Sequence, residues 1–256
     1  MSTTLRKSLR ILESLALSDT PRGISELARA IKLNKSAVQR IFQTLLEEGY
    51  IEKTADSSRY RPTLRIWELG SRVIAQNEAR RLVHPILRYA AKNSELTTYF
   101  AWADFPDIIY LDKIDGEKGR ANSSDPGQRI PMHVAASGRA ILAFLDEASI
   151  EEIAGKLTKE AAATGDAAAD LRKEIKLIRQ RLYACSERGS TARISSVAAP
   201  VWGSGPTPVG SVVLTSDSVT LPHSDFDRVG ALAISVAEQA TRVLGGSYPV
   251  TAGDAP

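Results

Sequence analysis

The stretch Asn34–Pro62, NKSAVQRIFQTLLEEGYIEKTADSSRYRP, joins an amphipathic segment to a short basic hairpin. In its first half, apolar residues recur at three- and four-residue spacing and fall in one sector of a helix. These residues are Val38, Ile41, Phe42, Leu45 and Leu46. Gly49 follows them and predicts the end of the helix. The stretch therefore predicts one helix packed against a core, followed by two short strands around an Asp-Ser-Ser turn.

The opposite side of this predicted helix carries a hydroxyl, two amides and a guanidinium. They belong to Ser36, Gln39, Arg40 and Gln43. In a major groove, arginine reads guanine, glutamine reads adenine, and serine contacts either. The alternative is a polar face that meets only water. We include Lys35, at the start of the same segment, in the predicted DNA-contacting set.

Two neighbouring features favour DNA binding over a solvated face. Upstream, ISELARAIKL at 24–33 predicts a helix capped by Ser25, and a tight turn joins it to the next helix, as in a helix-turn-helix. Downstream, the hairpin brings cations beside the helix, where they reach phosphates and give affinity without sequence information. These cations are Lys53, Arg59 and Arg61.

Charge is divided unevenly along the 256 residues, although the net charge is only +3. Residues 1–65 carry 12 lysines and arginines against 7 acidic residues, whereas the other 191 carry 21 against 23. A basic N-terminal part attached to a larger, nearly neutral part is typical of a DNA-binding module joined to a domain with another task.

Several classes of protein find no support in the composition. No apolar run approaches the roughly 20 residues of a spanning helix, and the N-terminus does not resemble a secretory signal, so we expect a cytoplasmic protein without membrane association. One cysteine, Cys185, excludes an intramolecular disulfide. Three histidines without metal-ligand spacing predict no metal site, and no cofactor motif is present.

The segment 24–70 resembles the winged helix-turn-helix of the IclR family of bacterial transcription regulators. The resemblance is carried by Glu-Leu-Ala at 26–28, Lys-Ser-x-Val-x-Arg at 35–40, Gly-Tyr-Ile at 49–51 and Arg-Tyr-Arg at 59–61. It continues in QRIPMHVAASGRAILAFL at 128–145 and in SSVAAPVWGSGPTPVGSVVLTS at 195–216. Three separated motifs in the same order cover most of the chain.

The resemblance implies an α+β protein with a GAF-like, mixed α/β effector-binding domain behind the DNA-binding module. It also implies homodimers that pair into tetramers. The domains we expect are a winged helix-turn-helix at 1–66, a linker helix at 67–80, the effector domain at 81–248 and a flexible tail at 249–256. The residues themselves agree with a mixed domain, because Tyr-, Ile- and Trp-rich runs alternate with helical patterns. The Ala-rich segment 158–171 is expected to form an exposed loop.

The predicted linker carries apolar residues with two open interpretations. They are Leu64, Trp67, Leu69, Val73 and Ile74. They pair with the same helix of a second subunit, as two-fold DNA readers require, or they pack within the chain. Both interpretations can hold together.

By resemblance, the effector pocket lies around the start of the 136–142 segment. Backbone N–H groups of Ala136 and Ser137 occupy positions that hold a small carboxylate in the family, and a helix start suits an anion. Serine stands at Ser196 where the family commonly has cysteine, and at Ser186 where an acidic residue is common. Two positions where family serines contact ligand hold other residues. They are Val213 and Thr215.

Three other residues have interpretations that bear on this site. Arg120 offers a charged clamp, or is simply exposed in its loop. His133 is interpreted as a structural hydrogen-bonding residue, and Cys185 as a partly buried thiol without a neighbouring base.

Together, these patterns predict a transcription factor that binds a double-stranded DNA operator under the control of a small organic or aromatic acid. One alternative is an enzyme that processes small acids and carries a DNA-binding appendage. WGSGP at 202–206 lacks the spacing of a nucleophile elbow, however, and no phosphate loop is present. A DNA-packaging protein is a third possibility, which would not need the larger domain.

Overall fold

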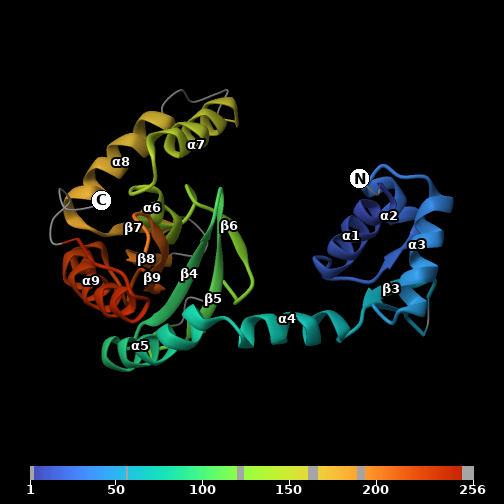
Figure 1. Cartoon of the computed structure of the whole chain (residues 1–256), viewed down its shortest axis with the longest axis horizontal. Coiled ribbons are helices and arrows are strands. Elements are labelled where there is room, and N and C mark those ends of the chain that lie inside the picture. The colour runs from blue at the N-terminus through green and yellow to red at the C-terminus, as the bar shows by residue number, and fades with distance from the viewer. Residues whose placement is uncertain (1–2, 56, 120–123, 161–166, 189–193, 250–256) are drawn as a thin grey trace. The chain divides into compact units, whose positions relative to one another are not determined.

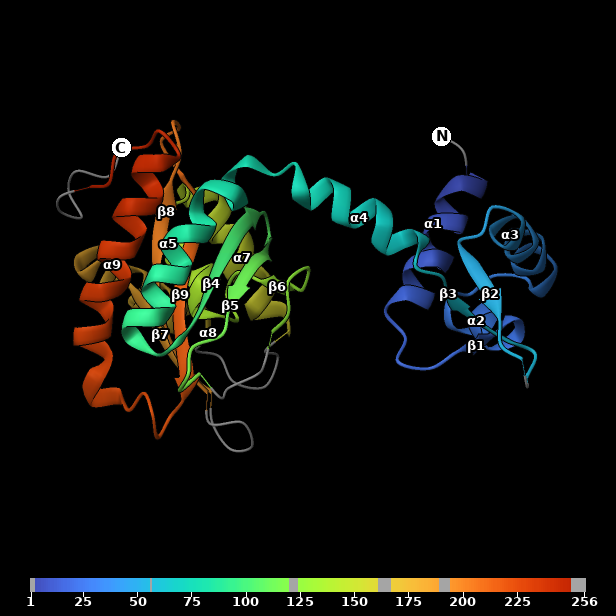
Figure 2. The ribbon, with the colours of Figure 1, turned by 90° about the horizontal axis from the view of Figure 1, so that it is seen from below.

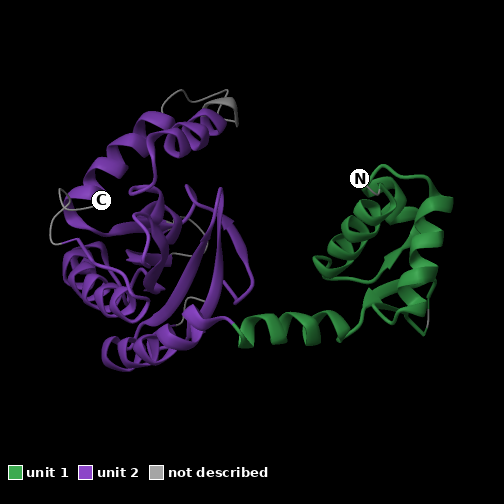
Figure 3. Ribbon diagram, viewed as in Figure 1, with its two compact units in different colours: residues 1–76 green, residues 77–256 purple. Residues whose placement is uncertain are grey.

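A computed structural model describes residues 3–55, 57–119, 124–160, 167–188 and 194–249. The chain forms two compact units, residues 1–76 and 77–256 (Figure 3). The division falls between Gln76 and Asn77, and each unit has its own hydrophobic core.

Unit 1 combines three helices, a small antiparallel sheet and a fourth helix. Its elements are α1 (Thr3–Ala16), β1 (Arg22–Gly23), α2 (Ile24–Ala30), α3 (Lys35–Glu47), β2 (Ile51–Lys53), β3 (Arg59–Pro62) and α4 (Arg65–Ala75). The sheet has the order β1-β3-β2. The expected apolar side of α3 faces the core, where Phe42 meets the Tyr60 ring edge-on with centroids 4.8 Å apart.

The start of α2 differs from the sequence prediction. Gly23, and not Ser25, occupies the N-cap position of the helix. The reason is β1, which pairs Gly23 with Arg59 and holds the chain extended up to that residue. The N-cap therefore lies two residues earlier than expected, and Ser25 lies inside the first turn of the helix.

Helix α4 buries none of its residues. Trp67 is 69% exposed and Val73 is 71% exposed, and Leu69 is also exposed. The apolar residues expected in the linker thus form a helix that the described part of the chain leaves uncovered.

Unit 2 is built on a six-stranded antiparallel sheet of order β6-β5-β4-β9-β8-β7 (Figure 1). Its strands are β4 (Thr97–Asp104), β5 (Asp107–Ile114), β6 (Arg129–Pro131), β7 (Ala184–Arg188), β8 (Ile194–Trp202) and β9 (Pro208–Asp217). Its helices are α5 (Glu78–Ser94), α6 (Ala136–Leu142), α7 (Glu147–Glu160), α8 (Ala167–Arg181), the short 3-10 helix η1 (His223–Asp225) and α9 (Phe226–Val243).

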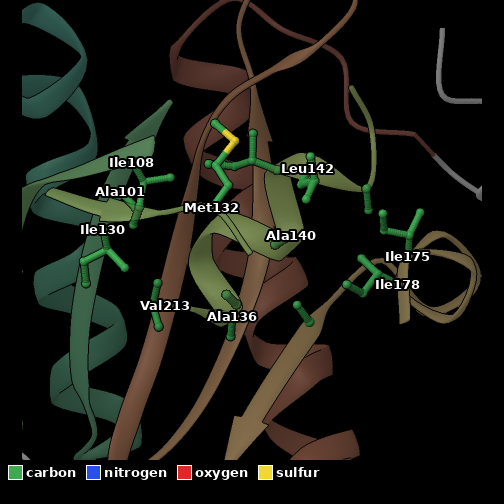
Figure 4. Close-up of a cluster of buried hydrophobic side chains, with 14 of the residues drawn as sticks. Ala101, Ile108, Ile130, Met132, Ala136, Ala140, Leu142, Ile175, Ile178 and Val213 are labelled. Carbon is green, nitrogen blue, oxygen red and sulfur yellow. The ribbon is translucent and has the colours of Figure 1, made fainter. Parts of the chain in front are cut away.

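Helices cover both faces of this sheet. Helices α5 and α9 pack against each other and on one face (Figure 2). Short helix α6 lies on the other face, and a core joins it to the sheet and to α7 and α8 (Figure 4). That core contains Met132 and Ala136 together with Ile108 and Val213 from the sheet and Ile175 from α8.

The segment predicted as an Ala-rich loop, 158–171, is mostly helical where it is described. Helix α7 continues to Glu160, and α8 begins at Ala167. Leu171 is buried in the core of unit 2 and fixes this end of α8, whereas residues 161–166 lie outside the described residues.

Strand β5 contains a bulge at Leu111. Asp112 is paired with Phe100 and Tyr110 with Ala101, so two steps along β5 correspond to one step along β4. Because side chains alternate along a strand, the extra residue turns Tyr110 and Asp112 to opposite faces of the sheet. Tyr110 faces α6, and Asp112 faces α5.

Candidate DNA-binding surface and effector cavity

The exposed side of α3 presents the predicted base-reading residues together. Ser36, Gln39, Arg40 and Gln43, with Lys35, are all exposed and lie opposite the buried side of the helix. Gln43 Nε2 donates a hydrogen bond to Glu47 Oε1 at 2.8 Å. Within the described residues, no carboxylate pairs with Lys35 or Arg40. This surface can offer hydroxyl, amide and guanidinium groups to base edges.

The hairpin β2–β3, which we call the wing, divides its three cations between two faces. Lys53 is paired with Tyr60 across the hairpin, and Arg61 is paired with Glu52. Alternation along each strand therefore places Lys53 on one face and both Arg59 and Arg61 on the other.

Both wing arginines already have partners. Arg59 Nη1 donates to Pro21 O at 2.9 Å and lies 3.4 Å from Glu26 Oε2. Arg61 Nε lies 2.6 Å from Glu52 Oε1. The sequence prediction had these side chains projecting from the hairpin. They are exposed, but they are held by carboxylates of the same unit.

In unit 2, a cavity of about 40 Å³ lies between α6 and the sheet. Its lining comprises Tyr110, Ser124, Ile130, Ala135, Ala136, Ser137, Ser186, Ile194, Ser196 and Val213. Five of the seven predicted effector residues are therefore brought together. Thr215 lies behind the lining, where its hydroxyl oxygen is 2.9 Å from Ser196 Oγ, and Arg120 falls outside the described residues.

Hydroxyl groups give the cavity its polar character. The Tyr110 hydroxyl lies 3.0 Å from Ser137 Oγ, and Thr215 donates to Ser195 O at 2.7 Å. Tyr99, whose ring packs against that of Tyr110, donates to Ser124 O at 3.1 Å. Burial raises the pKa of the Tyr99 phenol, so it remains a neutral donor.

Sequence reasoning missed half of the lining. Tyr110 could have been predicted from the sequence, because it lies two residues after Ile108 and so shares the core-facing side of a predicted strand. Ala135 immediately precedes the predicted helix residues. No local signal marks Ser124, Ile130 or Ile194, which reach the cavity from other segments of the fold.

Helix α6 is fixed in place by a close backbone contact and by Arg139. A Cβ atom on Gly138 would lie 2.3 Å from Met132 O. Arg139 Nη2 donates to Cys185 O at 3.1 Å, and Arg139 Nε lies 2.9 Å from Glu174 Oε1 on α8. Burial raises the pKa of Glu174, and the charge of Arg139 partly opposes this shift.

The described residues contain no group of three or more His, Cys, Asp or Glu side chains placed to hold a metal ion. None of the described helices is long and apolar enough to cross a membrane.

A winged helix-turn-helix with an exposed polar recognition helix, carried in one chain with an α/β unit, defines a DNA-binding transcription regulator. Two family profiles match the chain. One, described as "IclR helix-turn-helix domain", matches residues 4–55, and the other, "Bacterial transcriptional regulator IclR C-terminal", matches residues 71–242. The chain belongs to the IclR family, and the predicted α+β class and regulatory function are confirmed.

Curated relatives are named as regulators. The probable transcriptional regulator SauR of Cupriavidus necator is 29% identical over 197 residues, which cover 76% of this chain and 78% of the relative. The transcriptional repressor IclR of Escherichia coli K12 is 23% identical over 247 residues, covering 95% and 90%. These names support a regulator and not the alternative of an enzyme.

Solved structures share the fold. An IclR family regulator from Brucella abortus superposes with a TM-score of 0.81 at 22% identity, covering 94% of this chain and 92% of that one. An IclR homologue from Microbacterium hydrocarbonoxydans, complexed with 4-hydroxybenzoate, has a TM-score of 0.77 at 19% identity, covering 94% and 99%.

Proposed function

We propose that α3 reads an operator in the major groove through Ser36, Gln39, Arg40 and Gln43, with Lys35 at its start. The observation that carries this proposal is the exposure of all five side chains on the side of α3 opposite its buried residues. A helix in this setting enters the groove with its polar side toward the base edges. The wing cations Lys53, Arg59 and Arg61 contact phosphates and set affinity and register.

In the same proposal, the cavity of unit 2 binds a small organic or aromatic acid. The related Microbacterium protein holds 4-hydroxybenzoate, and the cavity here offers serine hydroxyls between apolar walls. Its volume of about 40 Å³ has room for only a few water molecules. An effector therefore binds only when the lining moves apart, which connects occupancy to the positions of α6 and the strands. Arg120, Thr215 and the cavity residues form the site we assign to it.

Two copies of the chain would present two recognition helices to one operator. Helix α4 supports this assembly, because its apolar side chains are exposed. We infer a homodimer, which can pair further into a tetramer, acting on DNA in the bacterial cytoplasm. In this proposal, residues 1–66 read DNA, 67–80 connect the two parts and 81–248 hold the effector. The predicted tail, 249–256, lies outside the described residues from position 250 onward.

A selection of bound sequences from a random duplex pool tests DNA reading by the full chain. The expected result is a motif with two inverted half-sites, as two-fold dimers select. The enriched duplex is then titrated in the presence of a panel of small carboxylic and aromatic acids, with 4-hydroxybenzoate included. One acid should shift operator affinity, and substitution of Ser196 by Leu should abolish that shift without changing operator affinity in its absence. A pool that enriches no motif at any salt concentration would refute base reading by α3.

A further inference from the structure

Glu26, in the first turn of α2, holds two arginines at once. Its Oε2 lies 3.4 Å from Arg59 Nη1, and its Oε1 lies 3.2 Å from Arg22 Nη1. Arg22 is held further by Ser18 Oγ, which accepts from its Nε at 2.9 Å. The carboxylate therefore joins the wing to the strand and helix that precede the recognition helix.

Glu52 repeats this arrangement within the wing. It stands directly opposite Arg61 in the register of β2 and β3, and its Oε1 lies 2.6 Å from Arg61 Nε. All three arginines and both glutamates remain partly or largely exposed to water. Each of the two wing arginines is thus paired with a carboxylate at a surface that water, or a phosphate, can reach.

The recognition helix shows the opposite pattern. Among the described residues, neither Lys35 nor Arg40 has an ion-pair partner, and both are exposed. Carboxylates therefore hold the two wing arginines, whereas Lys53 of the wing and the cations of α3 have no ion-pair partner among the described residues. The pairing thus falls on arginines assigned to phosphate contact, which is independent of sequence, and not on the base-reading helix.

We propose that Glu26 and Glu52 compete with DNA phosphate for the wing arginines and so limit the affinity of the protein for every duplex, whatever its sequence. This rests on the proposed contact between wing and phosphate. When a phosphate takes an arginine, the released carboxylate must be hydrated and attracts a cation. Each exchange therefore lowers the net number of cations released on binding. Because cation release drives sequence-independent binding, the affinity for any duplex falls.

The test measures binding of the full chain to a mixed-sequence 40-base-pair duplex between 50 and 300 mM salt, so no operator needs to be known. Exposed ion pairs are weak, which sets the expected effect: Glu26→Gln and Glu52→Gln each strengthen binding about two- to five-fold at the lowest salt. The slope of log affinity against log salt becomes steeper by up to about 0.9 for each variant. With a selected motif in hand, the preference for it over the mixed duplex stays within about two-fold, because no base contact changes.

Glu48→Gln is the matched control, since it removes an exposed negative charge of unit 1 that pairs with no described residue. It should strengthen binding much less, and an equal effect would overturn the proposal in favour of net charge alone. In an Arg61→Ala background, Glu52→Gln should strengthen binding no more than Glu48→Gln does. If Arg61→Ala weakens binding but Glu52→Gln does not strengthen it, the competition is refuted while the phosphate contact stands. If Arg61→Ala changes nothing, the phosphate contact itself fails.

Discussion

Gly138 shows how a single residue positions the helix that lines the proposed effector cavity. It lies in the first half of α6, and a Cβ there would come within 2.3 Å of Met132 O and 2.4 Å of Met132 Cα. Alanine favours a helix interior over glycine by about 1 kcal/mol, but a backbone clash of this depth costs more, on the order of 1–3 kcal/mol or above. We expect Gly138→Ala to lower the unfolding free energy of unit 2 in urea.

Gly155, in the interior of α7, provides the matched comparison. Apart from its chain neighbours and the backbone of its own helix, nothing lies within 4 Å of the position its Cβ would take. Gly155→Ala should therefore raise the unfolding free energy by about 0.5–1 kcal/mol. Equal effects of the two substitutions would show that α6 does not need its close approach to Met132.

Arg40 and Arg61 are expected to contribute differently to DNA binding. Arg40→Ala should cost roughly 1–3 kcal/mol at the selected motif and relax preference at one base position. Arg61→Ala should weaken binding to all sequences alike and flatten the salt slope. Its effect at low salt should be modest, because Glu52 already holds the guanidinium. Affinities for the motif and for single-base variants of it, measured at several salt concentrations, separate the two. Identical changes in both variants would contradict the division between reading and positioning residues.

At the scale of elements, the bulge in β5 sets the attachment of α5. By turning Asp112 toward α5, it brings Oδ1 to 3.2 Å from Arg80 Nη2 and Oδ2 to 2.6 Å from His84 Nδ1. The carboxylate side chain is 4% exposed, whereas Arg80 and His84 are 34% and 38% exposed. The first turn of α5, which begins at the boundary between the units, is thus held to the sheet that carries Tyr110.

Asp112→Ala should lower the unfolding free energy by about 1–3 kcal/mol. The loss should stay below the roughly 3–5 kcal/mol of a fully buried broken ion pair, because Arg80 and His84 can turn to water. Hydrogen exchange should accelerate in the first turns of α5. Asp170→Ala, which removes an exposed partner of Lys173, should change stability by less than about 0.5 kcal/mol. If Asp112→Ala lowers the unfolding free energy equally little, the Asp112 carboxylate does not anchor α5 to the sheet.

Elements with a strong periodic pattern could be predicted from the sequence, and those decided by distant partners could not. The spacing of Val38, Ile41 and Phe42 predicted α3, and runs rich in Tyr, Ile and Trp predicted β4 and β5. The two-residue strand β1 depends on pairing with β3, so no local pattern marks it, and the start of α2 was misplaced with it. Helix α8 has an Ala-rich beginning whose burial at Leu171 only the tertiary fold reveals.

For the candidate site the same distinction holds. The exposed face of α3 follows from one helical period. The partners of Arg59 do not, because Glu26 lies 33 residues away in the chain. The cavity gathers residues from α6, five strands and connecting segments, and the five lining residues that were predicted came from the family resemblance and not from a local pattern.

At the scale of the whole molecule, the exposed apolar residues of α4 predict association of two chains. Trp67 and Val73 together expose a large apolar area that the described part of the chain does not cover. Trp67→Ser with Val73→Ser should raise the dissociation constant of the homodimer at least about tenfold, since truncating a central tryptophan at an interface costs about 2 kcal/mol or more. Analytical ultracentrifugation of the full chain over a range of concentrations measures this change. Leu177→Ser, at an exposed position of α8, removes apolar surface elsewhere and should leave the dissociation constant unchanged.

On a motif of two half-sites, the double variant Trp67→Ser with Val73→Ser should also lose affinity and require more protein for half-saturation, while binding to a single half-site stays the same. A variant that sediments and binds the two-half-site motif as the natural chain does would show that α4 is not the surface through which two copies meet.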